Sequence, residues 1–366
     1  MLNSTSFLPN WTSAPGDTII DLLNERNISV EAFANRMENS VETVESLIEG
    51  QMEITTEISL KLSKVLGSSV DFWMRREFQY REDLIRLKKV AETAWLKLLP
   101  IADMVKFGWI QQHVSKSIPA LLEYFGVGSI TEWQIKYEAE MAQVSFRTSS
   151  AFKQQPAAVA AWLRQGEIQS NPIKCVPWSS ELFMSSLVEI KKLTKIKDPV
   201  EFLPKLAKIC ANSGVAIAIA KTPSGCQASG VTKFLTKDRA LIMLSFRYLT
   251  DDHFWFTFFH EAAHLLLHGN RSVFVEEIGK NRMISNEEKE ANEFAAETLI
   301  PSEKRPQMMK LSVTNKKSIV GFASSLGVSP GIVIGQLQHL GRIEHNRYNY
   351  YKRRFTWDNM PTTINP

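Results

Sequence analysis

The chain has 366 residues, of which 44% are hydrophobic and 22% are charged. This length and composition indicate a soluble globular protein of two or three domains. The formal net charge of +4 favours no particular partner.

Cysteine usage and hydropathy exclude further classes of protein. Cys175, Cys210 and Cys226 lie far apart and form no CxxC pair, which predicts a reducing compartment and argues against a thiolate metal site. Residues 1–10 lack the basic and apolar regions of a signal peptide, and no run of roughly 18 or more apolar residues predicts a membrane span. We therefore expect a cytoplasmic protein without membrane contact.

Residues 1–14 are expected to form a polar leader, and residues 15–80 predict a group of five helices. The spacing of Ala34, Val44 and Leu47 is typical of a helix-turn-helix, in which the second helix enters a DNA groove. The expected helices span residues 17–26, 30–37, 41–48, 55–66 and a segment that starts at residue 70.

This segment resembles the HigA-like antitoxins of the XRE helix-turn-helix family over about residues 14–80. The resemblance is carried by PGDTIIDLLNERNISVEAFANRMENSVETVESLIEGQMEITTEISLKLSKVLGSSVDFW. It implies a domain that binds DNA through the second helix of the motif. The candidate residues for contact with DNA or a partner are Glu42, Thr43, Glu45 and Ser46.

The charge of this domain weakens the expectation of DNA binding. Residues 15–80 hold 12 acidic and 6 basic side chains, a net charge of −6. Duplex DNA carries one negative charge per roughly 1.7 Å, so Glu42, Glu45 and Glu49 would be repelled. Glu38 also stands where such turns commonly prefer glycine. The acidic surface could instead bind a basic protein, such as another protein's helix-turn-helix.

Residues 81–211 predict a helical connecting region without a chemical motif. The expected helices span 81–99, 101–107, 119–125, 131–142, 157–164, 180–193 and 200–212. Strands are then expected at 215–220, 228–235 and 239–246, the last two as a hairpin. An exposed edge strand here could hold an extended peptide substrate.

The main chemical motif is HExxH, within FFHEAAHLLLHG at residues 258–269. On a helix, His260 and His264 share one face and can bind one Zn²⁺ at about 2.0–2.1 Å. Glu261 points away from this pair and is expected to act as general base on a water molecule. His268 could border the site, but a histidine in a last helical turn is also favoured by the helix dipole, and we prefer this second interpretation narrowly.

A second helix, residues 285–301, offers the third ligand. At roughly 100° per residue, Glu288 shares a face with Asn292 and with the small side chain of Ala295, which lets another helix approach closely. We expect Glu288 as the ligand and Asn292 as the hydrogen-bond partner of a ligating histidine, with Glu290 as the reserve ligand.

The remaining chain predicts a second helix-turn-helix-like pair at 319–326 and 330–340. The stretch 345–355 is basic with interleaved aromatic side chains. It either contacts nucleic acid or an acidic partner, or packs on the domain through its tyrosines.

Residues 214–345 resemble the ImmA/IrrE metallo-endopeptidases. The resemblance is carried by SGVTKFLTKDRALIMLSFRY, DDHFWFTFFHEAAHLLLHG, EKEANEFAAETLIP and FASSLGVSPGIVIGQLQ. It implies one zinc ion per chain, completed by Glu288, and cleavage of a regulatory protein such as an XRE-type repressor. Arg247 and His253 are open candidates for stabilising the oxyanion.

The expected fold is α+β and mostly helical. Its parts are a five-helix helix-turn-helix domain (15–80), a helical middle region (81–211), a zincin-like peptidase domain with a small sheet (212–345) and a basic aromatic tail (346–366). The expected function is a zinc endopeptidase with Glu261 as general base. The alternative is a transcriptional regulator or a toxin–antitoxin antitoxin, found in bacterial mobile elements, whose metal site is structural or a sensor. A cognate toxin and a homodimer stay open.

Overall fold

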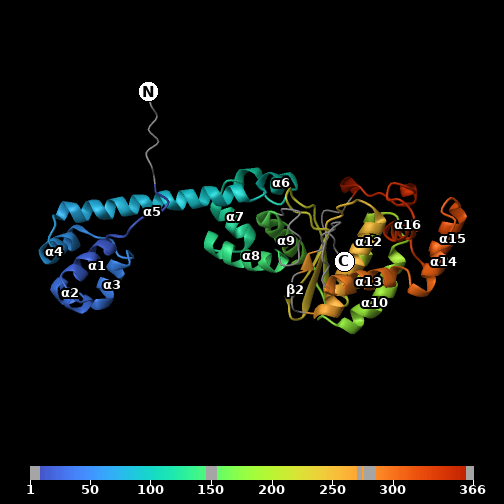
Figure 1. Cartoon of the computed structure of the whole chain (residues 1–366), viewed down its shortest axis with the longest axis horizontal. Coiled ribbons are helices and arrows are strands. Elements are labelled where there is room, and N and C mark those ends of the chain that lie inside the picture. Colours follow the sequence, from blue (N-terminus) through green and yellow to red (C-terminus); the bar gives the residue numbers. More distant parts are fainter. Residues whose placement is uncertain (1–8, 146–154, 270–273, 276–285, 360–366) are drawn as a thin grey trace, which may run out of the picture. The chain divides into compact units, whose positions relative to one another are not determined.

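A computed structural model describes residues 9–145, 155–269, 274–275 and 286–359. The chain divides into two compact units, Met1–Trp95 and Leu96–Pro366 (Figure 1). Most described residues are helical and one small sheet lies in the second unit, so the α+β, mostly helical prediction is confirmed.

The first unit is the predicted five-helix domain. Its apolar core contains Ile19, Phe33 and Trp73, all fully buried. The side chains of Ser29 and Ser40 accept hydrogen bonds from backbone N–H groups and thereby begin two of the helices. The helices are α1 (Pro15–Glu25), α2 (Val30–Met37), α3 (Val41–Ile48), α4 (Thr56–Leu66) and α5 (Val70–Leu98), which belongs to this unit as far as Trp95.

The turn between α2 and α3 has an unusual backbone. Glu38 lies in the left-handed region, with φ 56° and ψ 43°. A residue with a Cβ is disfavoured there, which is why glycine is common in such turns. Glu38 therefore adopts the left-handed conformation for which such turns commonly prefer glycine.

Helix α5 is longer than predicted. Two separate segments were expected, one from residue 70 and one over 81–99, but Val70–Leu98 is a single helix. The intervening residues MRREFQYREDL contain no glycine or proline, so nothing in the local sequence ends the helix. The predicted domain boundary at residue 80 thus falls inside α5.

Helices precede the sheet in the second unit, as predicted. They are α6 (Ile101–Lys106), α7 (Ile118–Phe125), α8 (Ile130–Ser145), α9 (Pro156–Ser170), α10 (Ser180–Leu193) and α11 (Pro199–Ala211). Helix α9 is buried along Ala157–Leu163 because it lies against the sheet. Gly166 permits this close approach, since a Cβ there would overlap the sulfur of Met243.

The sheet has the strand order β1-β3-β2-β4. Strand β1 (Val215–Ile219) runs parallel to β3 (Arg239–Leu244), and β2 (Gly230–Thr236) forms the predicted antiparallel hairpin with β3. The two-residue strand β4 (Phe274–Val275) pairs with β2 at Val231 and Thr232. Among the described strands, the outer ones are therefore β1 and β4.

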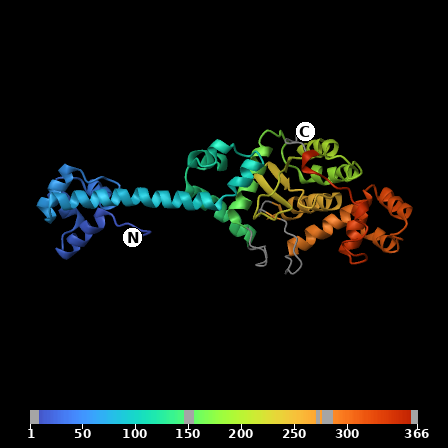
Figure 2. The same cartoon turned by 90° about the horizontal axis from the view of Figure 1, so that it is seen from above.

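Both faces of the sheet are covered by helices. Alternate residues of β1 point to opposite sides: Val215 and Ile217 pack with α10, α11 and α12, whereas Ala216 and Ala218 pack with α9. Figures 1 and 2 show α9 and α12 on opposite sides of the strands. The HExxH helix is therefore held on a rigid apolar layer.

The remaining helices complete this unit. They are α12 (Asp251–Ala263), which continues into a π-helical turn (His264–His268), α13 (Asn286–Leu299), α14 (Arg305–Met309), α15 (Lys316–Leu326) and α16 (Pro330–His339). Short 3₁₀ turns span Gln112–Val114, Ser302–Lys304, Asn349–Tyr351 and Trp357–Asn359. Over the described residues, no single helix is both long and apolar enough to cross a bilayer.

The start of α12 anchors the chain segment that follows α16. The carboxylate of Asp251 accepts hydrogen bonds from Ser329 Oγ at 2.6 Å and from the backbone N–H of Arg353 at 3.0 Å. Asp252 pairs with Lys352 at 2.6 Å, and Tyr351 is buried. Of the two interpretations of the basic aromatic tail, the structure favours packing on the domain.

A first prediction concerns the contact between α1 and α3. A Cβ on Gly16 would overlap the carbonyl oxygen of Ile48, so Gly16→Ala forces two backbones apart. We expect this variant to lower the free energy of unfolding of the first unit by about 1–3 kcal/mol. Hydrogen exchange of the α1–α4 amides measures it. The control Asp21→Ala, on the exposed side of α1, is expected to change stability by less than about 0.5 kcal/mol; equal protection in both variants would refute the close contact.

A second prediction concerns Asp251. Burial raises the pKa of its carboxyl to about 6, although the hydrogen bond from Ser329 opposes the shift. The folded state therefore holds this proton more tightly than the unfolded chain. The resulting stabilisation is present below about pH 4 and is lost as the pH rises through about 6.

We expect the unfolding free energy of the wild type, relative to Asp251→Asn, to fall by up to about 3 kcal/mol between about pH 4 and pH 7. Urea denaturation followed by tryptophan fluorescence measures this difference. A difference that does not vary with pH would contradict the raised pKa.

Candidate metal centre

Four ionisable side chains of the predicted site are buried together. His260, Glu261 and His264 lie on the HExxH helix, and Glu288 lies on α13; none is more than 8% exposed. Burying such groups in an apolar core is costly unless they have partners. The helix surface around them is apolar, because Phe258, Phe259 and other aromatic side chains of α12 fill the core.

The two imidazoles and the carboxylate converge on one point. His260 Nε2 and His264 Nε2 lie 3.0 Å apart. The Glu288 carboxylate oxygens lie 3.4 Å from His260 Nε2 and 3.5 Å from His264 Nε2. One donor atom from each residue lies within 4.8 Å of the others. Two imidazole nitrogens and a carboxylate oxygen form a donor set typical of catalytic zinc.

The protonation states suit a metal. Burial lowers the pKa of His264 to about 4, so this imidazole is neutral at pH 7. Burial by itself raises the pKa of Glu288, but its contacts with His260 and His264 outweigh burial and hold the pKa well below the usual range. Metal ligands must be neutral imidazoles and ionised carboxylates, which are the forms expected of His264 and Glu288.

The ring of His260 is held from the far side by Asn292. His260 Nδ1 lies 3.1 Å from Asn292 Oδ1. An amide oxygen only accepts, so the ring donates its Nδ1–H and leaves Nε2 bare towards Glu288 and His264. The two α13 residues chosen from the helical face, Glu288 and Asn292, thus both face His260.

The ring of His264 has a different support. His264 Nδ1 lies 2.9 Å from His268 Nδ1, and His268 Nε2 lies 3.0 Å from Glu290 Oε2. The sequence-based preference for a helix-dipole role of His268 missed these contacts. Glu290, the reserve ligand, has its carboxylate on His268 and is not in the cluster of Glu288 with the two histidines.

Glu261 lies against the first residue of β2. A Cβ on Gly230 would lie 2.7 Å from Glu261 Oε1, so only glycine leaves room for this carboxyl. Thr232 Oγ1 donates a hydrogen bond to the backbone oxygen of Glu261 at 3.1 Å. Sequence analysis did not identify Gly230, because a close approach between a strand and a helix leaves no sequence motif.

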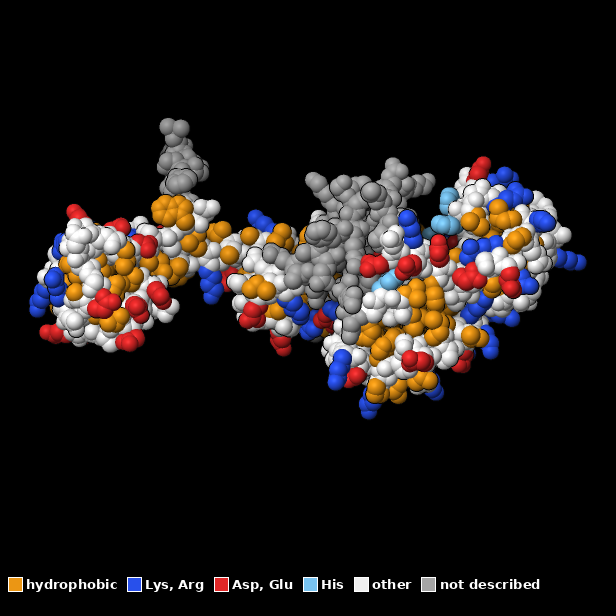
Figure 3. All heavy atoms as spheres, turned by 60° about the horizontal axis from the view of Figure 1, so that its bottom comes forward, with side chains coloured by type: hydrophobic (Ala, Val, Ile, Leu, Met, Phe, Trp, Pro, Cys, Tyr) orange, Lys and Arg blue, Asp and Glu red, His pale blue; other side chains and the backbone are white. Residues whose placement is uncertain are grey.

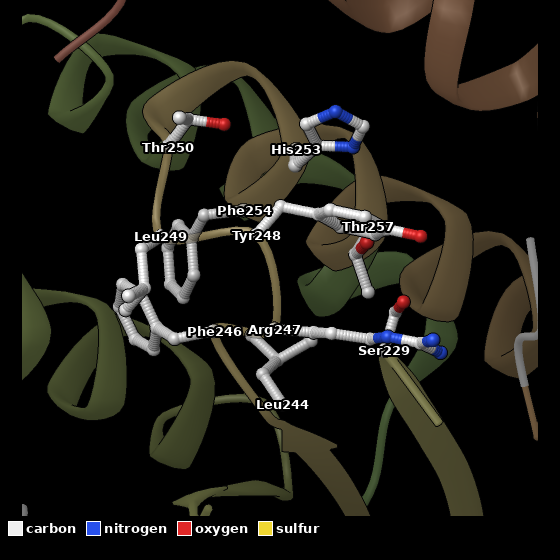
Figure 4. Close-up of a pocket in the computed structure, with 10 residues that line it drawn as sticks. All are labelled: Ser229, Leu244, Phe246, Arg247, Tyr248, Leu249, Thr250, His253, Phe254 and Thr257. Carbon is white, nitrogen blue, oxygen red and sulfur yellow. The ribbon is translucent and has the colours of Figure 1, made fainter. Parts of the chain in front are cut away.

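A small hollow lies one helical turn before Glu261. Its volume of about 10 Å³ is enough for about one water molecule. Arg247 and His253, the two oxyanion candidates, both line it, together with Thr257 of α12 (Figure 4). The Arg247 guanidinium donates to the carbonyl oxygen of Gln227, and the His253 ring stacks on Tyr248 with centroids 4.3 Å apart. Neither residue belongs to the cluster of His260, His264 and Glu288.

The candidate contact residues of the first unit lie on α3. Glu42 and Glu45 are exposed, whereas Thr43 and Ser46 are half-buried. The backbone N–H of Thr43 donates to the side chain of Ser40, so Thr43 is partly engaged in the cap of α3. Figure 3 shows several acidic side chains on the visible face of this unit.

Comparisons with known proteins agree with both units. Residues 215–337 match the family described as IrrE N-terminal-like domain, and residues 19–73 match the helix-turn-helix family. An uncharacterized HTH-type transcriptional regulator of Escherichia coli (strain K12), YddM, is 35% identical over 85 residues, which are 23% of this chain and 88% of that protein. The chain therefore joins an N-terminal domain of the XRE-type helix-turn-helix family to a C-terminal domain of the IrrE/ImmA-like peptidase family.

Proposed function

We propose that this protein is a zinc-dependent endopeptidase that cleaves a specific regulatory protein. The observation that supports it most is the buried cluster of His260, His264 and Glu288, together with the buried carboxyl of Glu261, the residue that follows His260 in the chain. One zinc ion per chain would be held by the first three residues. When bound, zinc would act as a Lewis acid that polarises the scissile carbonyl and lowers the pKa of the bound water to about 7.

Glu261 is the proposed general base. Its carboxyl is fully buried and neighbours His260 in the chain, but it is not one of the three clustered side chains. It would take a proton from the attacking water and give it to the nitrogen of the departing peptide. Gly230 leaves space for this carboxyl at the start of β2, so the backbone of the sheet fixes its position.

The substrate we propose is a repressor or partner with a helix-turn-helix domain. The support is the −6 charge of residues 15–80, which fits a basic protein surface better than phosphate groups. Glu42 and Glu45 are exposed on α3 and would contact such a partner. The protein and its substrate would meet in the cytoplasm, where the three cysteines stay reduced.

The second candidate function is transcriptional regulation or antitoxin activity, with the metal centre as a sensor or structural element. The similarity of the first unit to a protein named as a transcriptional regulator favours it. In this case DNA, a cognate toxin or a second copy of the chain would be the partner. The two functions are compatible, because a regulator can also be cut or can cut its partner.

A third prediction concerns metal content. Purified wild type is expected to carry about one zinc per chain, and His260→Ala and Glu288→Ala are expected to lose it, since each removes one of three ligands. Mass spectrometry of the metal in desalted protein measures this. The control Glu293→Gln changes an exposed carboxylate on the same helix and should keep the zinc. A wild type that binds no zinc after reconstitution would contradict the peptidase proposal.

A fourth prediction separates catalysis from metal binding. Glu261→Gln is expected to keep its zinc but to slow cleavage by about 10²–10⁴-fold, because the amide cannot accept the proton of water. New protein N-termini in cells that express wild type or variant, identified by mass spectrometry, measure the difference. If zinc-loaded wild type creates no termini beyond those seen with Glu261→Gln, the regulator function is favoured instead.

A further inference from the structure

We infer that His268 and Glu290 form a hydrogen-bonded relay that positions His264 for the metal. This inference rests on the proposed function, since it assumes an ion held by His260, His264 and Glu288. It assigns a role to two residues outside that cluster. Both would be positioning residues, because neither would touch the metal or the substrate.

The donor and acceptor roles along the relay follow from one requirement. His264 must offer an unprotonated Nε2 to a metal, so its proton sits on Nδ1. That N–H donates to His268 Nδ1, 2.9 Å away, which therefore carries its own proton on Nε2. His268 Nε2–H in turn donates to Glu290 Oε2 at 3.0 Å. Each atom has one consistent role, and the relay ends on a carboxylate that only accepts.

The elements that carry the relay fix its geometry. His264 and His268 are the first and last residues of the π-helical turn that continues α12. Such turns are uncommon and occur frequently at functional sites. Glu290 comes from α13, two residues after Glu288, so one helix supplies both the third ligand and the end of the relay.

The burial along the relay predicts how much each residue contributes. The His268 side chain is 7% exposed, whereas the Glu290 side chain is 60% exposed. The bond between the two imidazoles is therefore shielded from water, and the outer bond to Glu290 is screened. We expect His268 to contribute more to the orientation of His264 than Glu290 does.

The two metal-facing imidazoles then differ in character. His260 donates to a neutral amide oxygen of Asn292, whereas His264 is linked through His268 to a negative charge. A carboxylate at the end of such a link raises the basicity of the ligating nitrogen and fixes its tautomer. The relay would thus strengthen metal binding by His264.

The experiment measures zinc affinity of the full chain by competition with a chelator, in His268→Leu, His268→Asn and Glu290→Gln. Leucine keeps apolar bulk but no acceptor, while the Asn oxygen can take the place of Nδ1. We expect His268→Leu to weaken zinc binding about 10–100-fold, His268→Asn to recover much of that loss, and Glu290→Gln to weaken binding by a smaller factor. The matched control Glu293→Gln, an exposed acid on the same helix, should bind as wild type.

A spectroscopic measurement distinguishes positioning from general stability. With Co²⁺ in place of zinc, His268→Leu should change the visible absorption bands, which report ligand geometry, and His268→Asn should restore them. Zinc affinity of His268→Leu within about twofold of wild type would overturn the relay, as would equal losses in the Leu and Asn variants. If His268→Leu does not fold, a Glu290→Gln affinity equal to that of Glu293→Gln overturns it. A wild type that binds neither metal overturns the proposed function itself, which is a separate outcome.

Discussion

The second unit depends on how ionisable side chains are accommodated inside an apolar helix. Helix α12 is buried between the sheet and other helices, yet it places two imidazoles and a carboxyl in that core. Unpaired charges there would destabilise the fold. Helix α13 supplies a partner for these groups. Its small, fully buried Ala291 and Ala295 let it lie close to α12, and this brings Glu288 to both imidazoles. The pairing of Glu288 with His260 and His264 lowers the cost of burying these groups, and the same three side chains could hold a metal ion.

The position of α12 is fixed at both ends by distant parts of the sequence. Near its C-terminal end, Gly230 and Thr232 of β2 contact the side chain and backbone of Glu261. At its start, Asp251 binds Ser329 and the backbone of Arg353, which lie 78 and 102 residues further along the chain. A site on rigid, packed elements keeps its geometry more closely than a site on loops. The C-terminal segment therefore contributes to the site without facing it.

The sequence predicted what depends on local periodicity. Residues four apart on a helix share a face, which placed His260 with His264, and the same rule selected the α13 face of Glu288 and Asn292. It could not predict Gly230 or the contact from His268 to Glu290, because both depend on distances between elements. The continuity of α5 was missed for another reason: the boundary was placed where the resemblance to the helix-turn-helix family ends, near residue 80, although no residue there ends a helix.

In the proposed function, the acidic first unit brings its partner to the metal centre, because both belong to one chain. A partner bound by one unit is present at the other at an effective concentration set by the connection, not by its abundance in the cell. Recognition by the first unit can then be weak and still select one substrate among many. The net charge of −6 over residues 15–80 disfavours phosphate neutralisation as the main source of binding energy, whereas a basic protein helix would complement it. The specificity of the peptidase would then reside in the helix-turn-helix unit, and the buried metal centre would need to recognise little more than an accessible peptide bond.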